Sequence, residues 1–522
     1  MLFRKERSPY FYASLTLAVL VLVGWLFGRL LATSDNLYMR IRLLQDVVNE
    51  VSQRYVDEIA TDQLYHRAVE GLLKGLDPYT ELIPAEDFKR FQEIQVKSEY
   101  VGTGMSIGRT GGQIVVMSTF PGSSAYKQGI QPGDLIIKVG DQPTADWTTE
   151  QASLHLLGPE GSQVALTVAR QGATEPLEFT LTRKPVVVPT VTRHFMLEGG
   201  VGYVRLSSFT EKSADELRRS VEDLLSKGMK SLILDLRDNS GGLTDSAIDI
   251  CELFIGGKKL IVAIRGRRPE DSASYFSKGD AVFAGQPLAV LINEFTASSS
   301  EIVAGALQDH DRAVIVGENS YGKGLVQTTF PLKSGDVLKI TTARYYTPSG
   351  RNIQREHFRR IGNYDEEENE KPTQTTFKTD MGREVLGGGG IMPDVAVYTD
   401  SASFDPYIVE LLPHSFDFAV AYKSMNPGID HSFRADSKTF EAFVNFLNNK
   451  GFQVNDKKLQ KYRNYITDLL LTYRIGEVTW DDNSAYQMVA QADPQLTRAV
   501  EVLGSSPVQK EILRKISEET RK

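Results

Sequence analysis

The chain has one cysteine and seven histidines among 522 residues, so it lacks the usual means of forming a disulfide framework or a metal centre. A single cysteine excludes an intramolecular disulfide and any CxxC metal site. The histidines show none of the spacings typical of metal ligands, such as HExxH. Cys251 lies in an apolar helical pattern at residues 248–254, which predicts a buried and unreactive thiol. We therefore expect no metal and no cofactor.

Positive charge is also in short supply. The net charge is -8 at pH 7, and no basic stripe with interleaved aromatic residues is present, which argues against nucleic acid as a partner. Hydrophobic residues make up 41% of the chain and charged residues 24%, as is usual for globular proteins. A chain of 522 residues should contain about three or four domains.

The amino terminus has the features of a membrane anchor. An apolar run at residues 10–28 follows three basic residues, Arg4, Lys5 and Arg7. About 20 apolar residues suffice to cross the hydrocarbon core, and the basic flank stays in the cytoplasm. A cleaved signal peptide is the alternative, but the run is long for one and lacks a clear A-x-A site. We predict a signal anchor at residues 1–36, single-pass in the cytoplasmic (inner) membrane, with the remainder on the exported, periplasmic side.

Behind the anchor the chain divides into four segments, which together predict a multidomain α/β protein. They are a helical segment at 37–96, a β-rich unit at 97–185, an α/β core at 186–399 and a helical region at 400–522. In the core, residues 232–236 and 288–292 are continuous apolar runs, as expected for strands covered on both faces. An acidic stretch at about 362–382 is predicted to be a solvated loop. The apolar faces of the last helices should pack on the core, on another copy of the chain or on an adaptor.

A cluster of hydroxyl groups lies where a predicted strand ends and a helix begins. The apolar run 287–293 is followed by Thr296 and three consecutive serines, and a lysine lies between two glycines farther along the chain. Serine needs a base to become a nucleophile, and lysine can act as that base once desolvation disfavours its ammonium form. Ser298 and Glu301 also fit the S-x-x-E capping box, so a simple helix cap is the structural alternative.

Residues 296–307 and 317–327 together resemble the carboxyl-terminal processing (tail-specific) peptidases, a family of Ser-Lys proteases. The resemblance covers about residues 40–398. The family nucleophile precedes its lysine by twenty-five residues, which here selects Ser298 and Lys323. The resemblance implies that neutral Lys323 removes the serine proton and that Gln327 orients the lysine. The sequence departs from the family pattern in one respect, because it has a serine where the family usually has alanine after the nucleophile.

Another serine, Ser240, lies in residues 237–243, which superficially resemble the nucleophile loop of trypsin-like proteases, including exported ones with PDZ domains. A buried strand precedes this stretch and a helix follows it, whereas the trypsin fold is all-β. In the tail-specific family the stretch supplies a backbone amide to the oxyanion hole. The resemblance assigns that amide to Gly242, with Gly241 as the alternative. The second donor is then the amide of Ser299, at the start of a helix where negative charge is stabilised.

Residues 97–185 resemble a PDZ domain, most clearly in the run at 129–139. Such domains bind a peptide carboxyl terminus as an added strand, and backbone amides of a glycine-containing loop capture its carboxylate. Glycines in that loop allow close backbone approach. A PDZ unit with a purely structural role is the alternative. The predicted loop comprises Val101, Gly102, Thr103, Gly104 and Met105.

We therefore predict an anchored, exported serine endopeptidase. Its PDZ unit would hold the carboxyl-terminal tails of exported or membrane proteins and present them to Ser298. Two alternatives are a catalytically silent, membrane-anchored PDZ adaptor and a trypsin-like PDZ protease that uses Ser240. The joint presence of Ser298, Lys323 and Gln327 argues against the adaptor.

Overall fold

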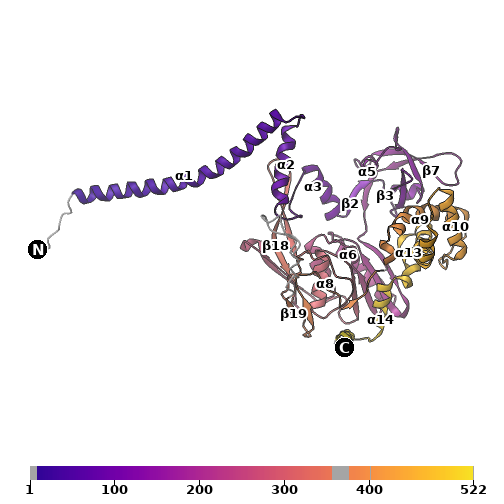
Figure 1. Cartoon of the computed structure of the whole chain (residues 1–522). Coiled ribbons are helices and arrows are strands. Elements are labelled where there is room, and N and C mark those ends of the chain that lie inside the picture. The colour runs from indigo at the N-terminus through magenta and orange to yellow at the C-terminus, as the bar shows by residue number, and fades with distance from the viewer. Residues whose placement is uncertain (1–8, 356–374, 400, 521–522) are drawn as a thin grey trace. The chain divides into compact units, whose positions relative to one another are not determined.

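The computed structural model describes residues 9–355, 375–399 and 401–520 (Figure 1). The predicted basic flank lies outside these residues, as does the part of the predicted acidic loop before residue 375. The chain forms two compact units, the first ending at Leu82 and the second beginning at Ile83.

The first unit is helical. Helix α1 (Pro9–Arg54), the long indigo helix in Figure 1, contains the whole predicted apolar run. Helix α2 (Thr61–Lys74) follows, and the short strand β1 (Glu81–Ile83) comes next. Within the described part of the chain, no helix combines the length and the hydropathy that a membrane span needs. The membrane anchor therefore stays a prediction.

A small β-rich domain follows in the second unit, as expected for the predicted PDZ unit. Its main sheet has the strand order β3-β4-β5-β7-β8, with β6 beside β5, so β3 is an edge strand. Helix α5 packs against this edge strand. A separate ribbon pairs β2 (Glu99–Gly102) with β9 (Lys184–Val187). The elements are β3 (Met105–Thr110), β4 (Gln113–Thr119), α4 (Ser124–Gln128), β5 (Leu135–Val139), β6 (Gln142–Pro143), α5 (Thr149–Leu156), β7 (Gln163–Ala169) and β8 (Leu177–Thr182).

A mainly parallel sheet of six strands forms the core, in the order β10-β11-β12-β15-β16-β21. Only β10 runs antiparallel to its neighbour. Every residue of β12 and β15 is buried, which confirms that these strands are covered on both faces. The strands are β10 (Val191–Met196), β11 (Val201–Leu206), β12 (Ser231–Asp235), β15 (Leu288–Ile292), β16 (Val314–Gly317) and β21 (Val395–Ala396).

Different helices cover the two faces of this sheet, because successive strand residues point to opposite sides. Leu232 and Leu234 pack with helices from the middle of the chain, namely α6 (Ser213–Ser226), α7 (Thr244–Glu252) and α8 (Ser299–Asp309). Ile233 packs on the opposite side with the last helices, α13 (Asp482–Val489), α14 (Pro494–Gly504) and α15 (Gln509–Thr520). These C-terminal helices thus pack on the core. Their contact with another copy or an adaptor stays a prediction.

The remaining elements frame the core. A second, antiparallel sheet holds β13 between β14 and β18, and β17 pairs with β18. Its strands are β13 (Leu260–Gly266), β14 (Ala273–Phe276), β17 (Leu325–Pro331) and β18 (Val337–Tyr346). The smaller elements are α3 (Ala85–Phe91) and the hairpin of β19 (Thr376–Lys378) and β20 (Glu384–Leu386). Four helices share an apolar cluster with Val115 of β4: α9 (Pro406–Met425), α10 (Ser437–Asn449), α11 (Asp456–Lys461) and α12 (Thr472–Thr479).

Candidate active site

Three serines at the junction between β15 and α8 differ in exposure and bonding. The hydroxyl of Ser299 donates to the carbonyl of Gly242 at 2.9 Å, and the hydroxyl of Ser300 donates to the carbonyl of Asn239 at 2.8 Å. Both side chains are fully buried. Ser298, which directly precedes α8, is partly exposed. Of the three serines, Ser298 is therefore the one that is not fully buried.

The backbone of Ser298 is strained. Its φ is 56° and its ψ is -115°, a combination that residues with a side chain rarely adopt. Holding a residue in such a region costs on the order of 1–3 kcal/mol, and such residues cluster at active sites. The strain lies at the turn from strand to helix, where the predicted nucleophile stands.

Glu301 joins the serine segment to the lysine segment. Oε2 of its fully buried carboxylate accepts hydrogen bonds from the backbone amides of Ser298 (2.8 Å) and Lys323 (2.9 Å). Oε1 accepts from the amide of Gly322 (2.8 Å) and from the hydroxyl of Ser320 (2.5 Å). Burial raises the pKa of this carboxyl, and the hydrogen bonds oppose the rise. From the sequence, Glu301 is recognisable only as half of a capping box. Its place at the head of an apolar helix is the one signal of a buried role.

The glycines on either side of Lys323 are required by close packing. A Cβ on Gly322 would lie 2.8 Å from Cβ of Arg355, and a Cβ on Gly324 would lie 2.9 Å from the backbone nitrogen of Gln354. Both distances are shorter than ordinary van der Waals contact. The loop that carries the lysine is therefore pressed against the segment around residue 354.

The backbones of the two predicted catalytic residues share a partner, Tyr345 of β18. Its hydroxyl is within hydrogen-bonding distance of the carbonyl of Ser298 at 3.1 Å and also of the carbonyl of Lys323. The structure thus brings the serine and lysine segments together. Gln327 lies on β17, where its side-chain amide donates to the hydroxyl of Thr341 at 3.3 Å. Its predicted contact with the lysine stays a prediction.

The loop after β12 lies against the serine segment. A Cβ on Gly241 would lie 2.9 Å from Cβ of Ser298 and 2.9 Å from the backbone nitrogen of Ser299. The amide of Gly241 already donates to Oδ1 of Asn239 at 2.9 Å. Among the residues that the structure describes, the amides of Gly242 and Ser299 donate to no protein acceptor. These two free donors are the pair implied by the family resemblance, one on the residue after Ser298 and one on the residue after Gly241.

Asn239 fixes this loop from inside. Its fully buried side chain donates to the carbonyl of Leu206 at 2.8 Å, and its backbone carbonyl accepts a hydrogen bond from the amide of Ala297 at 3.0 Å. Ser240 is the next residue, and it is exposed on the loop between β12 and α7. It therefore stands between a parallel strand and a helix.

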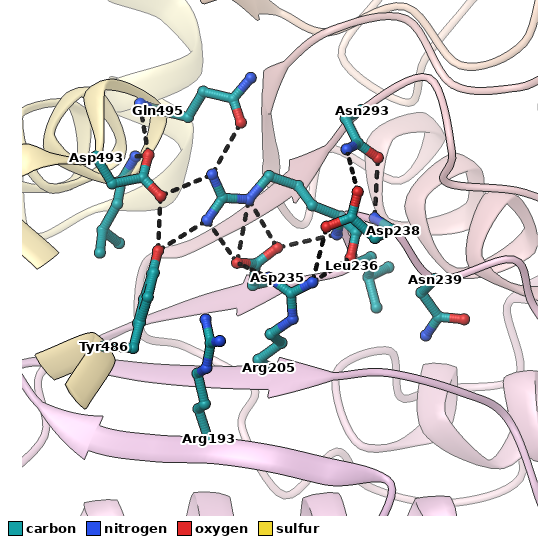
Figure 2. A network of polar contacts seen from close by, with 12 residues as sticks. Arg193, Arg205, Asp235, Leu236, Asp238, Asn239, Asn293, Tyr486, Asp493 and Gln495 are labelled. Atoms are coloured by element: carbon teal, nitrogen blue, oxygen red, sulfur yellow. Dashed lines mark hydrogen bonds and ion pairs between the residues drawn. The ribbon is translucent and has the colours of Figure 1, made fainter. Parts of the chain in front are cut away.

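A buried charge network lies behind the loop (Figure 2). Asp235, fully buried at the end of β12, accepts hydrogen bonds from Nη2 of Arg237 (2.6 Å) and the hydroxyl of Tyr203 (2.6 Å). Nη1 of Arg205 lies 3.7 Å from the same carboxylate. Burial raises the pKa of Asp235, but the charges of Arg237 and then Arg205 outweigh burial and lower it overall. Asp235 is therefore a carboxylate at neutral pH.

The predicted carboxylate-binding loop of the PDZ unit connects two strands. Val101 and Gly102 end β2, and Met105 begins β3. Thr103 and Gly104 lie between these strands, and in the described chain their backbone amides donate to no protein group. Two free amides at the start of an edge strand are a suitable receptor for a peptide carboxylate.

The remaining candidates for reactive chemistry are few. Cys251 is fully buried in α7, and burial raises the pKa of its thiol, so the structure confirms an unreactive core cysteine. Across the described residues, no group of three or more His, Cys, Asp or Glu side chains is arranged to hold a metal ion.

Comparison with known proteins decides the family. Residues 200–360 match Peptidase family S41, and residues 92–169 match the PDZ domain. The chain is 38% identical over 324 residues to the "Carboxy-terminal-processing protease" of Bartonella bacilliformis, a match that covers 61% of this chain and 74% of that protein. The chain belongs to the carboxyl-terminal-processing proteases. It is accordingly a serine peptidase, and its predicted α/β peptidase core and PDZ domain are confirmed.

A second relative agrees with this placement. The "Carboxyl-terminal-processing protease" of Synechocystis is 31% identical over 377 residues, which covers 67% of this chain and 86% of that protein. Among solved structures, a photosystem II D1 C-terminal processing protease is 25% identical with a TM-score of 0.36, covering 68% of this chain and 92% of that chain. A serine peptidase of family S41 is neither a silent adaptor nor a trypsin-like protease, so both alternatives are wrong.

Proposed function

We propose that this carboxyl-terminal-processing protease cleaves peptide bonds with Ser298 as nucleophile and Lys323 as base. Neutral Lys323 takes the proton from Ser298 Oγ as this oxygen attacks the scissile carbonyl carbon, and the amides of Gly242 and Ser299 stabilise the resulting oxyanion. The lysine ammonium then protonates the leaving amine. In the second half of the reaction, Lys323 takes a proton from water as the water oxygen attacks the acyl carbon, and it returns this proton to Ser298 Oγ as the acyl C–Oγ bond breaks. Gln327 orients the lysine.

One observation carries this proposal. Ser298 is the partly exposed and strained member of the three serines. It is followed by the amide of Ser299 and packs against the loop that carries the amide of Gly242, and neither amide has a protein acceptor in the described chain. Strain of this kind costs free energy and persists only where the surrounding structure enforces it. A helix cap alone gives no reason for this combination, because a cap needs neither the strain nor the free amides.

A serine-reactive fluorophosphonate followed by peptide mapping tests the assignment. We expect the label on Ser298, and we expect Lys323→Ala to prevent labelling while the protein stays folded by circular dichroism. Ser240→Ala is the matched control and should be labelled as well as the unchanged enzyme. A label on Ser240, Ser299 or Ser300 would contradict the proposal.

We also propose that the PDZ unit selects substrates by their free carboxyl terminus. The tail would add as a strand beside β3, and its carboxylate would accept hydrogen bonds from the loop of residues 101–105. Support comes from the position of β3 at the sheet edge and from the free amides of Thr103 and Gly104. A solved PDZ domain of a carboxy-terminal protease from Vibrio cholerae, 24% identical and with a TM-score of 0.17, is described as a complex with peptide.

For the location, we propose that the basic flank and the apolar run at 10–28 anchor the chain in the cytoplasmic membrane, with both domains on the exported side. The tails of exported or membrane proteins would then be the substrates. A reporter that is active only outside the cytoplasm, fused after residue 400, should be active. The same fusion without residues 1–36 should be inactive, and activity in both fusions or in neither would contradict the anchor.

A further inference from the structure

Tyr486, Asp493 and Gln495 lie near the loop that follows β12 (Figure 2). We call this loop, residues 236–243, the oxyanion loop, and the three side chains contact its buried Arg237. Nη2 of Arg237 donates to the hydroxyl of Tyr486 at 2.9 Å, and Nη1 donates to Oε1 of Gln495 at 3.0 Å. Nη1 also lies 2.8 Å from Oδ2 of Asp493. The tyrosine comes from α13 and the other two residues from the start of α14.

Among the described residues of the core, Asp235 is the one carboxylate that pairs with Arg237, and it is shared. It faces the guanidinium groups of both Arg237 and Arg205, whereas Arg205 has a further carboxylate of its own in Asp238 at 2.8 Å. A buried charge without a partner is strongly destabilising. Asp493, outside the core sheet, supplies the second carboxylate, and the hydroxyl of Tyr486 donates to it at 2.6 Å.

The backbone of Arg237 leads directly to the free amide of Gly242. The amide of Arg237 donates to Asp235 at 2.9 Å, and its carbonyl accepts from Arg205 at 3.2 Å. The amide of Asp238 donates to Asn293 at 2.9 Å. Together with the contacts of Asn239 and Gly241, these bonds hold four residues of the loop, Arg237, Asp238, Asn239 and Gly241, so a shift of Arg237 would strain the short backbone that leads to Gly242.

Gln495 also reaches the segment that carries the lysine. Its Nε2 donates to the carbonyl of Val397 at 2.8 Å and lies 3.3 Å from Oε1 of Glu318. The same carboxylate accepts the amide of Thr399 at 2.6 Å. Glu318 stands five positions before Lys323. Gln495 of α14 therefore contacts Arg237 of the oxyanion loop through Oε1 and Glu318, which precedes the lysine loop, through Nε2.

We propose that Tyr486, Asp493 and Gln495 are positioning residues, through which the C-terminal helices hold the Gly242 amide at the distance that the oxyanion requires. The inference builds on the proposed serine mechanism and gives the C-terminal region a role in the reaction beyond covering the sheet. Donors of an oxyanion hole act only when they are preorganised, so a small displacement of the loop lowers the rate without changing substrate binding.

The test uses Tyr486→Phe, which keeps the aromatic ring and removes only the hydroxyl between Arg237 and Asp493. Truncating Asp493 would be less informative because its side chain also accepts the amides of Gln495 and Leu496 at the start of α14. The matched control is Tyr473→Phe. The hydroxyl of Tyr473 donates to Asp482 at 2.5 Å beside Arg193 of β10, and its ring packs against the apolar cluster that contains Tyr486. The hydrogen bonds of this hydroxyl in the described chain go to Asp482, Arg193 and Glu477, and not to Arg237 or Asp493.

For the full-length enzyme with Tyr486→Phe, we expect kcat to fall by about tenfold, less than the roughly hundredfold or greater loss known when a donor is removed outright. KM for a tailed peptide should change by less than about twofold. Affinity for a peptide boronate, whose boron bonds to Ser298 Oγ and mimics the tetrahedral intermediate, should fall by the same factor as kcat. Gln495→Leu should act in the same direction, whereas Tyr473→Phe should leave kcat and boronate affinity unchanged.

Two outcomes would overturn the inference, and they differ from failure of the serine mechanism. Unchanged kcat and boronate affinity in Tyr486→Phe would show that the helices do not position the loop. Equal losses in Tyr486→Phe and Tyr473→Phe, in step with lowered Tm, would show a purely structural role. Failure of the boronate to inhibit the unchanged enzyme would instead overturn the proposed mechanism, and the inference with it.

Discussion

Oε2 of Glu301 lies 2.8 Å from the backbone nitrogen of Ser298 and accepts its hydrogen bond. The same oxygen accepts the amide of Lys323 at 2.9 Å. Two segments that are far apart in the sequence are thus joined by one buried carboxylate. A carboxylate offers acceptors on both oxygens, whereas the amide of glutamine offers one acceptor and one donor group. The site therefore requires the charged residue.

Glu301→Gln should lower both activity and stability. The NH2 group of glutamine would face backbone amides that themselves need an acceptor, and a buried donor left unsatisfied costs about 1–3 kcal/mol. We expect the free energy of unfolding to fall by about this amount and kcat to fall at least about tenfold. Glu294→Gln is the control, since this exposed residue lies in the same segment. Unchanged kcat in Glu301→Gln would contradict the assigned role.

The rate of cleavage should fall at low pH for two reasons, protonation of the lysine base and protonation of Glu301. Burial raises the pKa of Glu301, so this carboxyl takes up a proton above the pH usual for glutamate. Protonation removes an acceptor from the amides that it holds. On the acid side, log kcat/KM should fall with a slope of one from protonation of the lysine base, and more steeply below the pKa of Glu301.

Protonation of Glu301 should affect the stability of the fold in the opposite sense to the cleavage rate. Because the pKa of Glu301 is raised in the folded state, its pH-dependent contribution to the free energy of unfolding is fully present below the ordinary pKa of 4.5 and is lost as pH rises through the folded pKa.

In Glu301→Gln the steep part of the rate profile should vanish, and the part caused by the lysine should remain. Replacing any single histidine should leave both limbs in place. A slope of one persisting down to pH 4.5 would exclude the role of Glu301.

Local patterns predicted the junction of strand and helix with its cluster of hydroxyl groups and the lysine between two glycines, and the family resemblance then selected Ser298 and Lys323. Apolar runs, hydroxyl residues and glycines are signals carried by neighbouring residues. The contact of Arg237 with Gln495 has no such signal, because it joins positions 258 residues apart and depends on which helices cover the second face of the sheet. The sequence predicts Glu301 as part of a capping box, but a capping box gives no indication that its side chain is completely buried.

Gly242→Ala should remove activity through the backbone. The φ of Gly242 is 146°, and an added Cβ would lie 2.1 Å from the carbonyl oxygen of Phe209. The loop must move, so we expect kcat to fall roughly a hundredfold, as for loss of an oxyanion donor. Gly257→Ala is the control, because its φ is 81° and its Cβ would meet nothing within 4 Å. That variant should lose about 1–2 kcal/mol of stability and keep its kcat. A normal kcat in Gly242→Ala would argue against this amide as a donor.

Asp235→Asn should destabilise the core strongly. The change leaves the buried guanidinium groups of Arg205 and Arg237 without their shared carboxylate, and breaking such a buried set costs about 3–5 kcal/mol. The lowered pKa of Asp235 means that its contribution is present above the ordinary value of 3.8 and is lost as pH falls toward the folded pKa. Denaturant unfolding should therefore show a large difference from the unchanged enzyme near neutral pH and a smaller one well below pH 3.8.

Asp238→Asn is the control for that measurement. Its side chain is exposed, and its ion pair with Arg205 at 2.8 Å should be worth less than about 1 kcal/mol. Equal losses in the two variants, or a loss in Asp235→Asn that does not depend on pH, would contradict the account of a buried carboxylate between two arginines.

Tail recognition can be separated from cleavage at Gly104. Its φ is 81°, and a Cβ added there would lie 2.1 Å from Cβ of Ser123, so Gly104→Ala must displace the loop that we propose binds the carboxylate. Hydrogen bonds to a charged group contribute about 1.5–3 kcal/mol, so a free-acid tail should bind the unchanged enzyme about ten- to a hundredfold more tightly than the amidated tail. In Gly104→Ala this preference should disappear, because only the free-acid tail loses affinity. Gly112→Ala, with a φ of 82° and no atom within 4 Å of its Cβ, should keep the preference.

Titration of fluorescent tail peptides into Ser298→Ala enzyme measures binding without cleavage. Equal affinity of the unchanged PDZ unit for acid and amidated tails would contradict carboxylate reading and move substrate choice to the catalytic groove.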